Sequence, residues 1–463
     1  MSEKWINDAP KIVVKPPGPK GQKIIEQNYK YVSSLALGIA KVLRVVFDEA
    51  KGAVVKDVDG NVYIDFTSGV TTDNTGHSHP KVVKAIQEQA PKFLHPYEYP
   101  TKLRGEVAEL LCKITPGSFE KRVIFANCGS ESVENAFRLC EMATKKHEFI
   151  GFWNSFHGKT RGSASMTGLS GTKKGLKLLS GCYTMPYPWC RHCFLNVKNK
   201  YPDCALECLK IMDPILSYET SGDVAGLIME PVGGLIGSLP PKEYMKELKK
   251  KCEDNNIIFI DDEVQSGMGR TGKMFAIEYS GVEPDVLTTG KGLSSGLPVG
   301  STVFRKDLFE TEEMLKNYGG IMTSTFAGNG ISMAAAKASI GVYLDEKLPE
   351  NAAKQGAYIM KRLGEIQKES KIIANFEGTG LLILVEFMKD KKPWRHWDFT
   401  PGKEMVMDMC RESFEHGLLM FNSGWHGGAV KICPPLVITR EQAEKGMDVF
   451  AESVKTVQKK HLG

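Results

Sequence analysis

Residues 257–265 have the sequence IIFIDDEVQ, and this stretch decides the fold. Its apolar, mostly β-branched start is typical of a buried strand, and the strand runs directly into acidic side chains. Further along, Val286 to Thr289 is a second strand-like segment, and it is followed by a charged residue in Gly290-Lys291-Gly292. Ligands of open α/β sheets bind outside the carboxyl ends of the strands. Asp262 and Lys291 are therefore predicted to lie at one ligand-binding edge of a sheet.

An acid and a lysine at nearby strand ends suit a site for pyridoxal phosphate. The lysine would bond the aldehyde of the cofactor, and the acid would keep the ring nitrogen protonated so that the ring can accept electrons. Charged residues after a buried strand are also common in ordinary surface loops. Neither segment alone decides between these two interpretations.

The composition is that of an ordinary globular protein. The chain has 463 residues, of which 42% are hydrophobic and 25% charged, so it can bury a large core. The net charge of +5 is small, and neither a dense basic stripe nor a nucleic-acid motif is present, which argues against a nucleic-acid partner. Neither a membrane-length apolar run nor a signal peptide is found. We therefore expect a cytoplasmic protein without membrane contact, whose 11 cysteines are mostly reduced.

The rest of the chain alternates between strand-like and helix-like segments. A helix is predicted over Gln22 to Leu35, and an antiparallel meander over Val42 to Phe47, Val54 to Val58 and Val62 to Phe66, with an Asp59-Gly60 turn. Further buried strands are predicted near residues 123, 149 and 225, with helices between them. This alternation predicts an α/β fold with a mixed or parallel sheet.

A candidate phosphate site follows the strand at Val123 to Ala126. Gly129 and Ser130 lie between this strand and a predicted helix over Glu131 to His147, where free N–H groups and the helix dipole favour an anion. The alternative is an ordinary helix that Ser130 caps. Phe156 follows another strand and could stack on a flat ring or simply belong to the core.

Four cysteines lie close together in one insertion: Cys190, Cys193, Cys204 and Cys208. Their spacing suits a small zinc knuckle or two disulfides, but such residues can also act as small hydrophobic side chains. The three alternatives stay open, and no metal site is predicted.

The order of the motifs resembles class III (ω-amino acid type) aminotransferases, which are pyridoxal phosphate enzymes of fold type I. The resemblance runs from about Gly52 to the C-terminus. It implies a large domain at residues 71–345 with a mixed, mostly parallel sheet, and a small α+β domain formed by residues 1–70 and 346–463. The motifs are Ser68-Gly69 to Gly76-His77, Gly129-Ser130-Glu131, Phe156-His157-Gly158, Glu230-Pro231, Asp262-Glu263-Val264-Gln265, Gly267 to Gly272, Thr289-Gly290-Lys291 and Ser324 to Asn329.

The resemblance also implies a role for individual residues. Lys291 would bond pyridoxal 5'-phosphate and later move a proton, and Asp262 would pair with the ring nitrogen. Thr325 would bind the phosphate of the neighbouring subunit, which implies a homodimer with a shared active site, or a tetramer built from such dimers. The other implied cofactor contacts are Val264 and Phe156 on the two ring faces, Gln265 on the phenolic oxygen, and Gly129 and Ser130 on the phosphate.

Two departures from the family pattern concern the substrate. Ornithine- and 4-aminobutyrate-type members have an arginine where this chain has Glu377, and they have its glutamate partner where this chain has Leu235. A glutamate repels a carboxylate, so the donor is predicted to be an amine, a β- or ω-amino acid or a β-aminoacyl thioester. The last option resembles the 3-aminoacyl-CoA aminotransferase branch, for which Lys391 to Arg395 could contact a nucleotide or be a solvated turn.

Three functions are compatible with this scaffold. The predicted one is a ping-pong transfer of an amino group to a 2-oxo acid such as 2-oxoglutarate or pyruvate. An amino-acid racemase or epimerase would retain the same cofactor residues. A non-catalytic pyridoxal-binding regulator is disfavoured because no DNA-binding module is attached.

Overall fold

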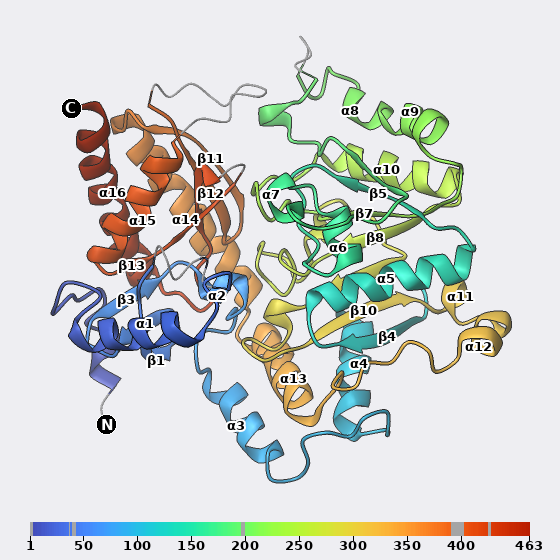
Figure 1. Cartoon of the computed structure of the whole chain (residues 1–463), viewed down its shortest axis with the longest axis horizontal. Helices are drawn as coiled ribbons and strands as arrows, with labels where there is room; N and C mark the ends of the chain where they lie inside the picture. The colour runs from blue at the N-terminus through green and yellow to red at the C-terminus, as the bar shows by residue number, and fades with distance from the viewer. Residues whose placement is uncertain (1–2, 37, 39–42, 196–199, 390–401, 425–426) are drawn as a thin grey trace. The chain divides into compact units, whose positions relative to one another are not determined.

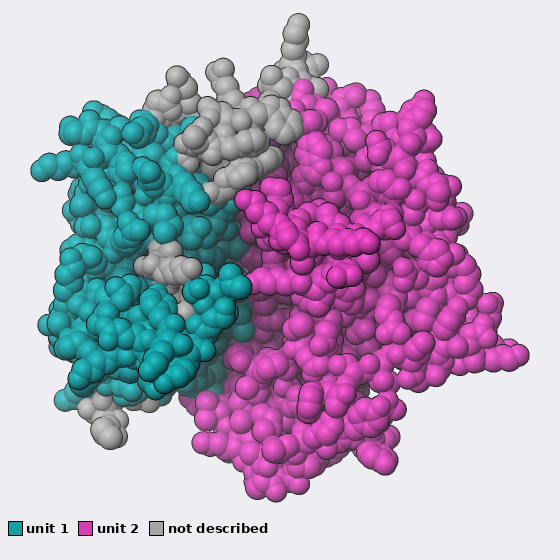
Figure 2. All heavy atoms as spheres, in the orientation of Figure 1, with its two compact units in different colours: residues 1–79, 350–463 teal, residues 80–349 magenta. Residues whose placement is uncertain are grey.

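A computed structural model describes residues 3–36, 38, 43–195, 200–389, 402–424 and 427–463. The contacts within the chain divide it into two compact units (Figure 2). One consists of residues 80–349, and the other combines residues 1–79 with 350–463. The domain boundaries proposed from the sequence, at residues 70/71 and 345/346, stay a prediction.

Within its described residues, the unit at 80–349 has a seven-stranded sheet with the order β4-β10-β9-β8-β7-β5-β6 (Figure 1). β10 is antiparallel to both of its neighbours, and the other strands run in one direction. The predicted mixed, mostly parallel sheet is therefore confirmed. The strands are β4 (Lys121–Ala126), β5 (Glu148–Phe152), β6 (Cys182–Met185), β7 (Val224–Met229), β8 (Ile258–Asp262), β9 (Val286–Thr289) and β10 (Gly300–Arg305).

The sheet is held by a buried apolar core. α5 (Gly129–Thr144) packs across several of its strands, and α10 (Lys242–Asp254) contacts β8. Each fully buried Val, Leu, Ile or Phe side chain contributes about 1.5–3 kcal/mol to folding. The core residues between α5 and the sheet include Phe137, Phe149, Ile228, Ile260 and Val286.

The sequence did not predict β6 and β10. Both begin with small or polar residues, Cys182 in β6 and Gly300-Ser301-Thr302 in β10, so neither starts with the apolar run used to find the other strands. The remaining elements of this unit are α3 (Pro80–Gln89), α4 (Lys102–Ile114), α6 (Arg161–Met166), α7 (Ser170–Lys173), η3 (Cys190–His192), α8 (Glu207–Lys210), α9 (Met212–Pro214), η4 (Ile215–Glu219), η5 (Ala276–Tyr279), η6 (Lys291–Leu293), α11 (Lys306–Phe309), α12 (Glu312–Tyr318) and α13 (Gly330–Asp345).

The other unit is built from both ends of the chain. Its described residues form two four-stranded sheets, β1-β2-β3-β13 and β11-β12-β15-β14. The strands are β1 (Phe47–Lys51), β2 (Val54–Asp57), β3 (Val62–Asp65), β11 (Ile373–Thr379), β12 (Leu382–Phe387), β13 (Leu418–Leu419), β14 (Phe421–Ser423) and β15 (Ala429–Ile432). The helices are η1 (Glu3–Ile6), α1 (Pro19–Tyr31), α2 (Ser68–Thr71), α14 (Leu348–Glu369), α15 (Lys403–Glu415) and α16 (Arg440–Leu462).

The predicted hairpin is confirmed, but the first strand of the meander is wrong. β2 and β3 pair antiparallel around the Asp59-Gly60 turn, where Gly60 has a φ of 92°. The first strand begins at Phe47, where the predicted strand ended. β1 is largely exposed and carries charged residues, so it lacks the apolar alternation that marks a half-buried strand.

Among the residues that the structure describes, no helix combines the length and the apolar character needed to span a membrane.

Candidate active site

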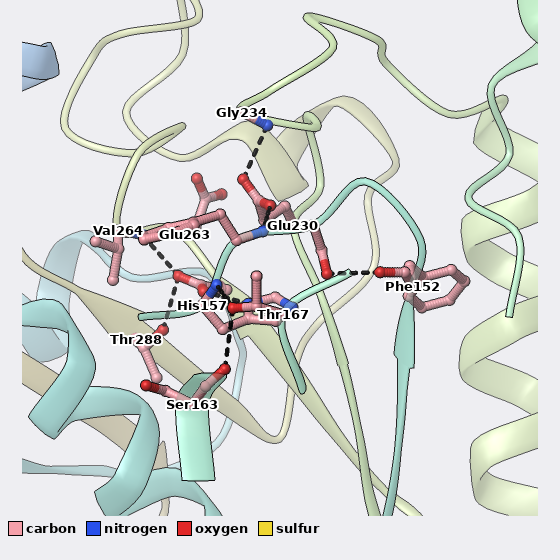
Figure 3. Close-up of polar contacts among 12 residues, drawn as sticks. Phe152, His157, Ser163, Thr167, Glu230, Gly234, Glu263, Val264 and Thr288 are labelled. Carbon is pink, nitrogen blue, oxygen red and sulfur yellow. Dashed lines mark hydrogen bonds and ion pairs between the residues drawn. The ribbon is translucent and has the colours of Figure 1, made fainter. Parts of the chain in front are cut away.

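Asp262 is the centre of a buried polar network at the carboxyl end of β8. Its partners His157, Val264 and Thr288 are labelled in Figure 3. Its Oδ1 accepts hydrogen bonds from the Val264 N–H at 3.0 Å and the Thr288 hydroxyl at 3.2 Å. Its Oδ2 lies 2.6 Å from Nδ1 of His157, which is fully buried. Because a carboxylate only accepts hydrogen bonds, Nδ1 of His157 carries the proton. Three partners therefore fix this carboxylate in one orientation.

The neighbouring acids have different environments. Successive side chains of a strand point to opposite faces, so Asp261 faces away from Asp262. Its two oxygens are fully buried and have no hydrogen-bond partner, and burial raises the pKa of Asp261 well above its usual range, with Glu263 and Asp262 adding to the effect. Burial also raises the pKa of Glu263 to about 8, although Glu263 accepts hydrogen bonds from the Ser266 hydroxyl and the Ile277 N–H. Of these three acids, Asp262 is the one whose carboxylate is held by the donors His157, Thr288 and Val264.

Lys291 follows the adjacent strand, β9, at the same edge of the sheet. Thr288 lies opposite Asp262 in the pairing of β8 with β9, which brings the two strand ends together as predicted. Lys291 is half-buried and has a φ of 37°, a left-handed conformation that is strained for a residue with a side chain. Such strain is concentrated at functional sites.

The predicted phosphate turn is the first turn of a helix. α5 begins at Gly129, two residues earlier than expected, so the alternative in which Ser130 caps the helix does not hold. Cys128 is the N-cap residue, and no side chain caps the helix. The first N–H groups of a helix have no acceptor within the helix, so this end of α5 can bind an anion. The Ser130 hydroxyl accepts the Lys159 N–H at 3.2 Å.

The start of α5 lies against the other predicted cofactor residues. A Cβ atom added to Gly129 would come within 2.5 Å of a Val264 methyl carbon, so only glycine allows this approach. A Cβ atom at Gly290 would lie 3.1 Å from the Gly129 nitrogen. The Ser132 hydroxyl also donates to the carbonyl of Thr289 at 3.0 Å. The helix end, Val264 and the lysine-bearing strand end therefore form one site.

Phe156 and Gln265 are joined to this site through Glu230, which follows β7. The Phe156 N–H donates to Oε1 of Glu230 at 2.8 Å, and the Gly234 N–H donates to Oε2 at 2.8 Å. The Gln265 side-chain amide donates to the Gly234 carbonyl at 3.2 Å. Glu230 is almost fully buried, and burial raises its pKa; the positive charge of a protonated His157 would lower it and Asp262 raises it.

Three further residues were singled out from the sequence: Thr325, Leu235 and Glu377. Thr325 is exposed, but the hydroxyl of the preceding Ser324 accepts a hydrogen bond from the Asn127 amide at 2.9 Å, next to the start of α5. Leu235 is half-buried in a turn where the Gly237 N–H donates to the Gly233 carbonyl at 2.7 Å. Glu377 lies on β11 in the unit formed by both ends of the chain.

Sequence reasoning assigned no role to His157, Thr288 or Glu230. His157 and Glu230 belong to two of the family motifs, Phe156-His157-Gly158 and Glu230-Pro231. Thr288 could have been found by aligning the ends of the two parallel strands, since it pairs with Asp262. The hydrogen bonds made by His157 and Glu230 connect residues far apart in the chain, and no local pattern indicates them.

The four cysteines of the insertion carry free thiols. Cys208 is on α8, and burial raises the pKa of its thiol to about 12; negative charges on the other three thiols would add to the effect. Among the described residues, no three histidine, cysteine or acidic side chains are arranged to hold a metal ion. Within the described part of the insertion, these four thiols therefore form neither of the two disulfides that their spacing suits.

These residues fit pyridoxal phosphate. A carboxylate has about four acceptor positions, and Asp262 uses three of them, which leaves one for a protonated ring nitrogen. The uncapped start of α5 suits a phosphate group, and the half-buried Lys291 suits the aldehyde. When bound, this cofactor supplies an electron-accepting ring that stabilises negative charge next to the amino group of a substrate.

Comparisons with known proteins agree with this geometry. Residues 38–454 match the family model of the class-III aminotransferases. An alanine/serine racemase of Pyrococcus horikoshii is 36% identical over 96% of this chain and 93% of its own length. A 5-aminovalerate aminotransferase, DavT, of Pseudomonas putida is 33% identical over 91% of this chain and 96% of its own.

Solved structures share the fold. A crystal structure of an S-selective transaminase from Bacillus megaterium matches with a TM-score of 0.84 and 26% identity, covering 95% of this chain and 99% of the other. The match of the family model over most of the chain, together with the arrangement of Asp262, Lys291 and the start of α5, identifies the family. The chain is an enzyme of fold type I that belongs to the class III aminotransferase family, and its cofactor is pyridoxal 5'-phosphate.

Proposed function

We propose that this enzyme transfers an amino group from an amine, a β- or ω-amino acid or a β-aminoacyl thioester to a 2-oxo acid in a ping-pong reaction. The observation that carries the proposal is the position of Leu235. It adjoins Gly234, whose carbonyl binds Gln265, so it lies beside the predicted cofactor residues. A half-buried leucine there cannot pair with a carboxylate-binding arginine.

The cofactor roles of individual residues belong to the same proposal. Lys291 bonds the cofactor and moves the proton, while Asp262, held by His157, Thr288 and Val264, keeps the ring nitrogen protonated. The other proposed contacts are Phe156 and Val264 on the ring faces, Gln265 on the phenolic oxygen, and Gly129 and Ser130 on the phosphate.

Glu377 supports the same choice of donor. An acidic side chain in place of the arginine of ornithine-type members repels a substrate carboxylate rather than binding it. The acceptor is a 2-oxo acid, 2-oxoglutarate or pyruvate. The segment proposed to contact the nucleotide of a thioester, Lys391 to Arg395, lies outside the described residues.

We also propose a homodimer in which Thr325 binds the phosphate of the neighbouring subunit, in a cytoplasmic enzyme. The segment around Thr325 is exposed, and Phe326 has 62% of its surface accessible. Arg104 joins this segment to the loop between α3 and α4, because it donates to the Ala327 carbonyl at 3.1 Å and also to the Tyr97 carbonyl. The exposed large side chains of these segments are Phe93, Leu94, Tyr97, Tyr99, Ile321 and Phe326. Apolar surface of this kind favours a second copy of the chain.

Racemisation is the second candidate, and one specific observation favours it. The racemase from Pyrococcus horikoshii is 36% identical over 96% of this chain. A racemase needs the same cofactor residues and differs in returning the proton to either face of the same carbon.

A half-reaction screen tests the proposal. The yellow enzyme is mixed with single donors in the absence of an oxo acid, and the rates at which its cofactor absorbance bleaches are ranked. Amines, β-amino acids and their thioesters are expected to bleach it faster than ornithine or alanine. The reverse order would contradict the argument from Leu235 and Glu377.

Chiral analysis of the same mixtures separates the two candidates. A transaminase converts at most one equivalent of donor per subunit before it stops for lack of an acceptor. A racemase interconverts the enantiomers through many turnovers without one. Repeated inversion of L-alanine or L-serine would therefore replace the transaminase proposal with the second candidate.

A further inference from the structure

Glu230 is a buried carboxylate at the end of β7 that the proposed chemistry does not use. Only 3% of its surface is exposed. Its two oxygens accept hydrogen bonds from two different loops, Oε1 from the Phe156 N–H and Oε2 from the Gly234 N–H, each at 2.8 Å. Figure 3 shows the hydrogen bond between Gly234 and Glu230. A buried charge is costly unless hydrogen bonds satisfy it, and here both oxygens have a donor.

The contact at Gly234 extends to Gln265. The Gly234 carbonyl accepts the Gln265 amide at 3.2 Å, so a single glycine residue connects the carboxylate to that side chain. A Cβ atom at Gly234 would lie 2.6 Å from both Oε2 of Glu230 and Oε1 of Gln265. The turn is therefore packed so closely that a small displacement moves both partners.

The main chain around Glu230 is also held. The Tyr187 hydroxyl lies 3.0 Å from the Glu230 carbonyl and 3.2 Å from the Ser238 carbonyl. Tyr187 is buried, so this contact joins the strand end to the far side of the Gly234 turn. With its backbone fixed, the carboxylate has a defined position relative to both loops.

We propose that Glu230 is a positioning residue that sets the separation between Phe156 and Gln265, the side chains proposed to contact the cofactor ring. Its negative charge lets one side chain accept from two backbone N–H groups at once. This inference rests on the proposed cofactor contacts of these two residues, and it is independent of the identity of the amino donor.

Two substitutions test the negative charge and the length of the Glu230 side chain separately. Glu230→Gln keeps the size, but its amide oxygen accepts from one N–H while its NH2 group faces the other donor. Glu230→Asp keeps the charge, but it is one methylene shorter and reaches only one loop. Losing one charged hydrogen bond should weaken cofactor binding roughly ten- to a hundred-fold. Both variants should also reduce the visible circular dichroism of the bound cofactor, because the ring is then held less rigidly.

Glu148 provides a matched control at the opposite end of the sheet. It is the first residue of β5, its surface is 9% exposed, and its carboxylate accepts the Ser221 N–H at 3.0 Å and the Tyr183 hydroxyl at 3.0 Å. Glu148→Gln therefore also removes a buried carboxylate that accepts two hydrogen bonds, but away from the proposed site. It should lower thermal stability and leave cofactor affinity and the visible signal unchanged.

The experiment titrates each apo-protein with pyridoxal phosphate and records the dissociation constant, the visible circular dichroism and the melting temperature. The inference is supported if both Glu230 variants bind the cofactor at least about ten-fold more weakly while Glu148→Gln binds it normally. It is overturned if Glu230→Gln keeps the wild-type affinity and signal, or if Glu148→Gln changes them to the same extent.

A second variant keeps the test decisive if the Glu230 variants do not fold. Gly234→Ala retains the carboxylate and displaces the turn, so it should weaken cofactor binding in the same way; unchanged binding would overturn the inference. No amino donor is present in these titrations. Their result is therefore separate from that of the half-reaction screen, which tests the proposed function.

Discussion

Replacing Asp262 by asparagine should slow the reaction far more than the same substitution at the neighbouring Asp261. The asparagine oxygen can still accept the Val264 N–H and the Thr288 hydroxyl, which lie 3.0 and 3.2 Å from Oδ1 of Asp262 in the native protein. The new NH2 group, however, faces the Nδ1–H of His157 across a distance that is 2.6 Å in the native protein. His157 must then move its proton to Nε2, a buried atom without a hydrogen-bond partner.

The size of the effect follows from the lost charge. Two unit charges about 4 Å apart at an effective dielectric constant of about 20 attract each other by ~4 kcal/mol. Losing most of that stabilisation of a protonated ring nitrogen corresponds to a rate about 10²- to 10³-fold lower. The loss of a charged partner for His157 should cost a further ~1.5–3 kcal/mol of folding free energy in the apo-protein.

The assay is stopped-flow bleaching of the cofactor by a saturating donor, with Asp261→Asn as the matched control. That substitution replaces the carboxyl group of the adjacent residue on the opposite face of β8, where both oxygens lack partners. Its bleaching rate should stay close to that of the wild type. An Asp262→Asn rate within about three-fold of the wild type, roughly 0.7 kcal/mol, would refute the reasoning, as would a larger loss in Asp261→Asn.

Three further predictions concern the lysine, the subunit contact and pH. Lys291→Ala should abolish multiple-turnover transamination while leaving the fold intact by far-UV circular dichroism, because a left-handed φ of 37° gives this lysine no conformational advantage over alanine; persistent turnover would reassign the lysine. Mixing inactive Lys291→Ala subunits with Thr325→Ala subunits should restore activity if Thr325 serves the neighbouring site, since one site of each mixed dimer is then intact; no restoration would place Thr325 in its own subunit's site. Burial raises the pKa of Glu263 to about 8, so the folded state holds a proton that the unfolded state releases near pH 4.3. The contribution of Glu263 to stability should fall as the pH rises between these values and then level off, and Glu263→Gln should reduce the slope of a plot of melting temperature against pH.

The sequence predicted the parts of the site that follow from strand ends. Asp262 and Lys291 could be placed at one edge because each follows a short apolar run, and parallel strands bring such ends together. The same logic located Gly129 and Ser130, although α5 begins two residues earlier than expected. Strands that begin with polar residues, such as β10, and exposed strands, such as β1, were not predicted. The apolar pattern used to find strands reflects burial more than local propensity, and these strands lack it.

The residues that orient the predicted ones could not be found in this way. His157 contacts Asp262 across 105 residues of sequence, and Glu230 contacts Phe156 across 74. Such pairs depend on how the loops close over the sheet, which hydrophobic periodicity does not encode. The motif order did indicate that these residues matter, but only the three-dimensional structure indicates what they hold.

The pairing of the two chain ends has a consequence for synthesis on the ribosome. β3 is extended by β13, with the Ile64 N–H bonded to the Gly417 carbonyl at 2.9 Å, and the Ser68 hydroxyl bonds the Cys433 carbonyl 365 residues away. At about 5–20 residues per second, the N-terminal hairpin waits roughly 20–70 s for these partners to emerge. During that interval Lys11 can pair this edge of β3 at Val62, but the edge beyond Val62 is open and can associate with other nascent chains. Heterologous expression should therefore gain soluble yield from slower initiation or from chaperones that shield early hydrophobic strands, and deletions that remove the segment after α15 should leave this edge permanently open.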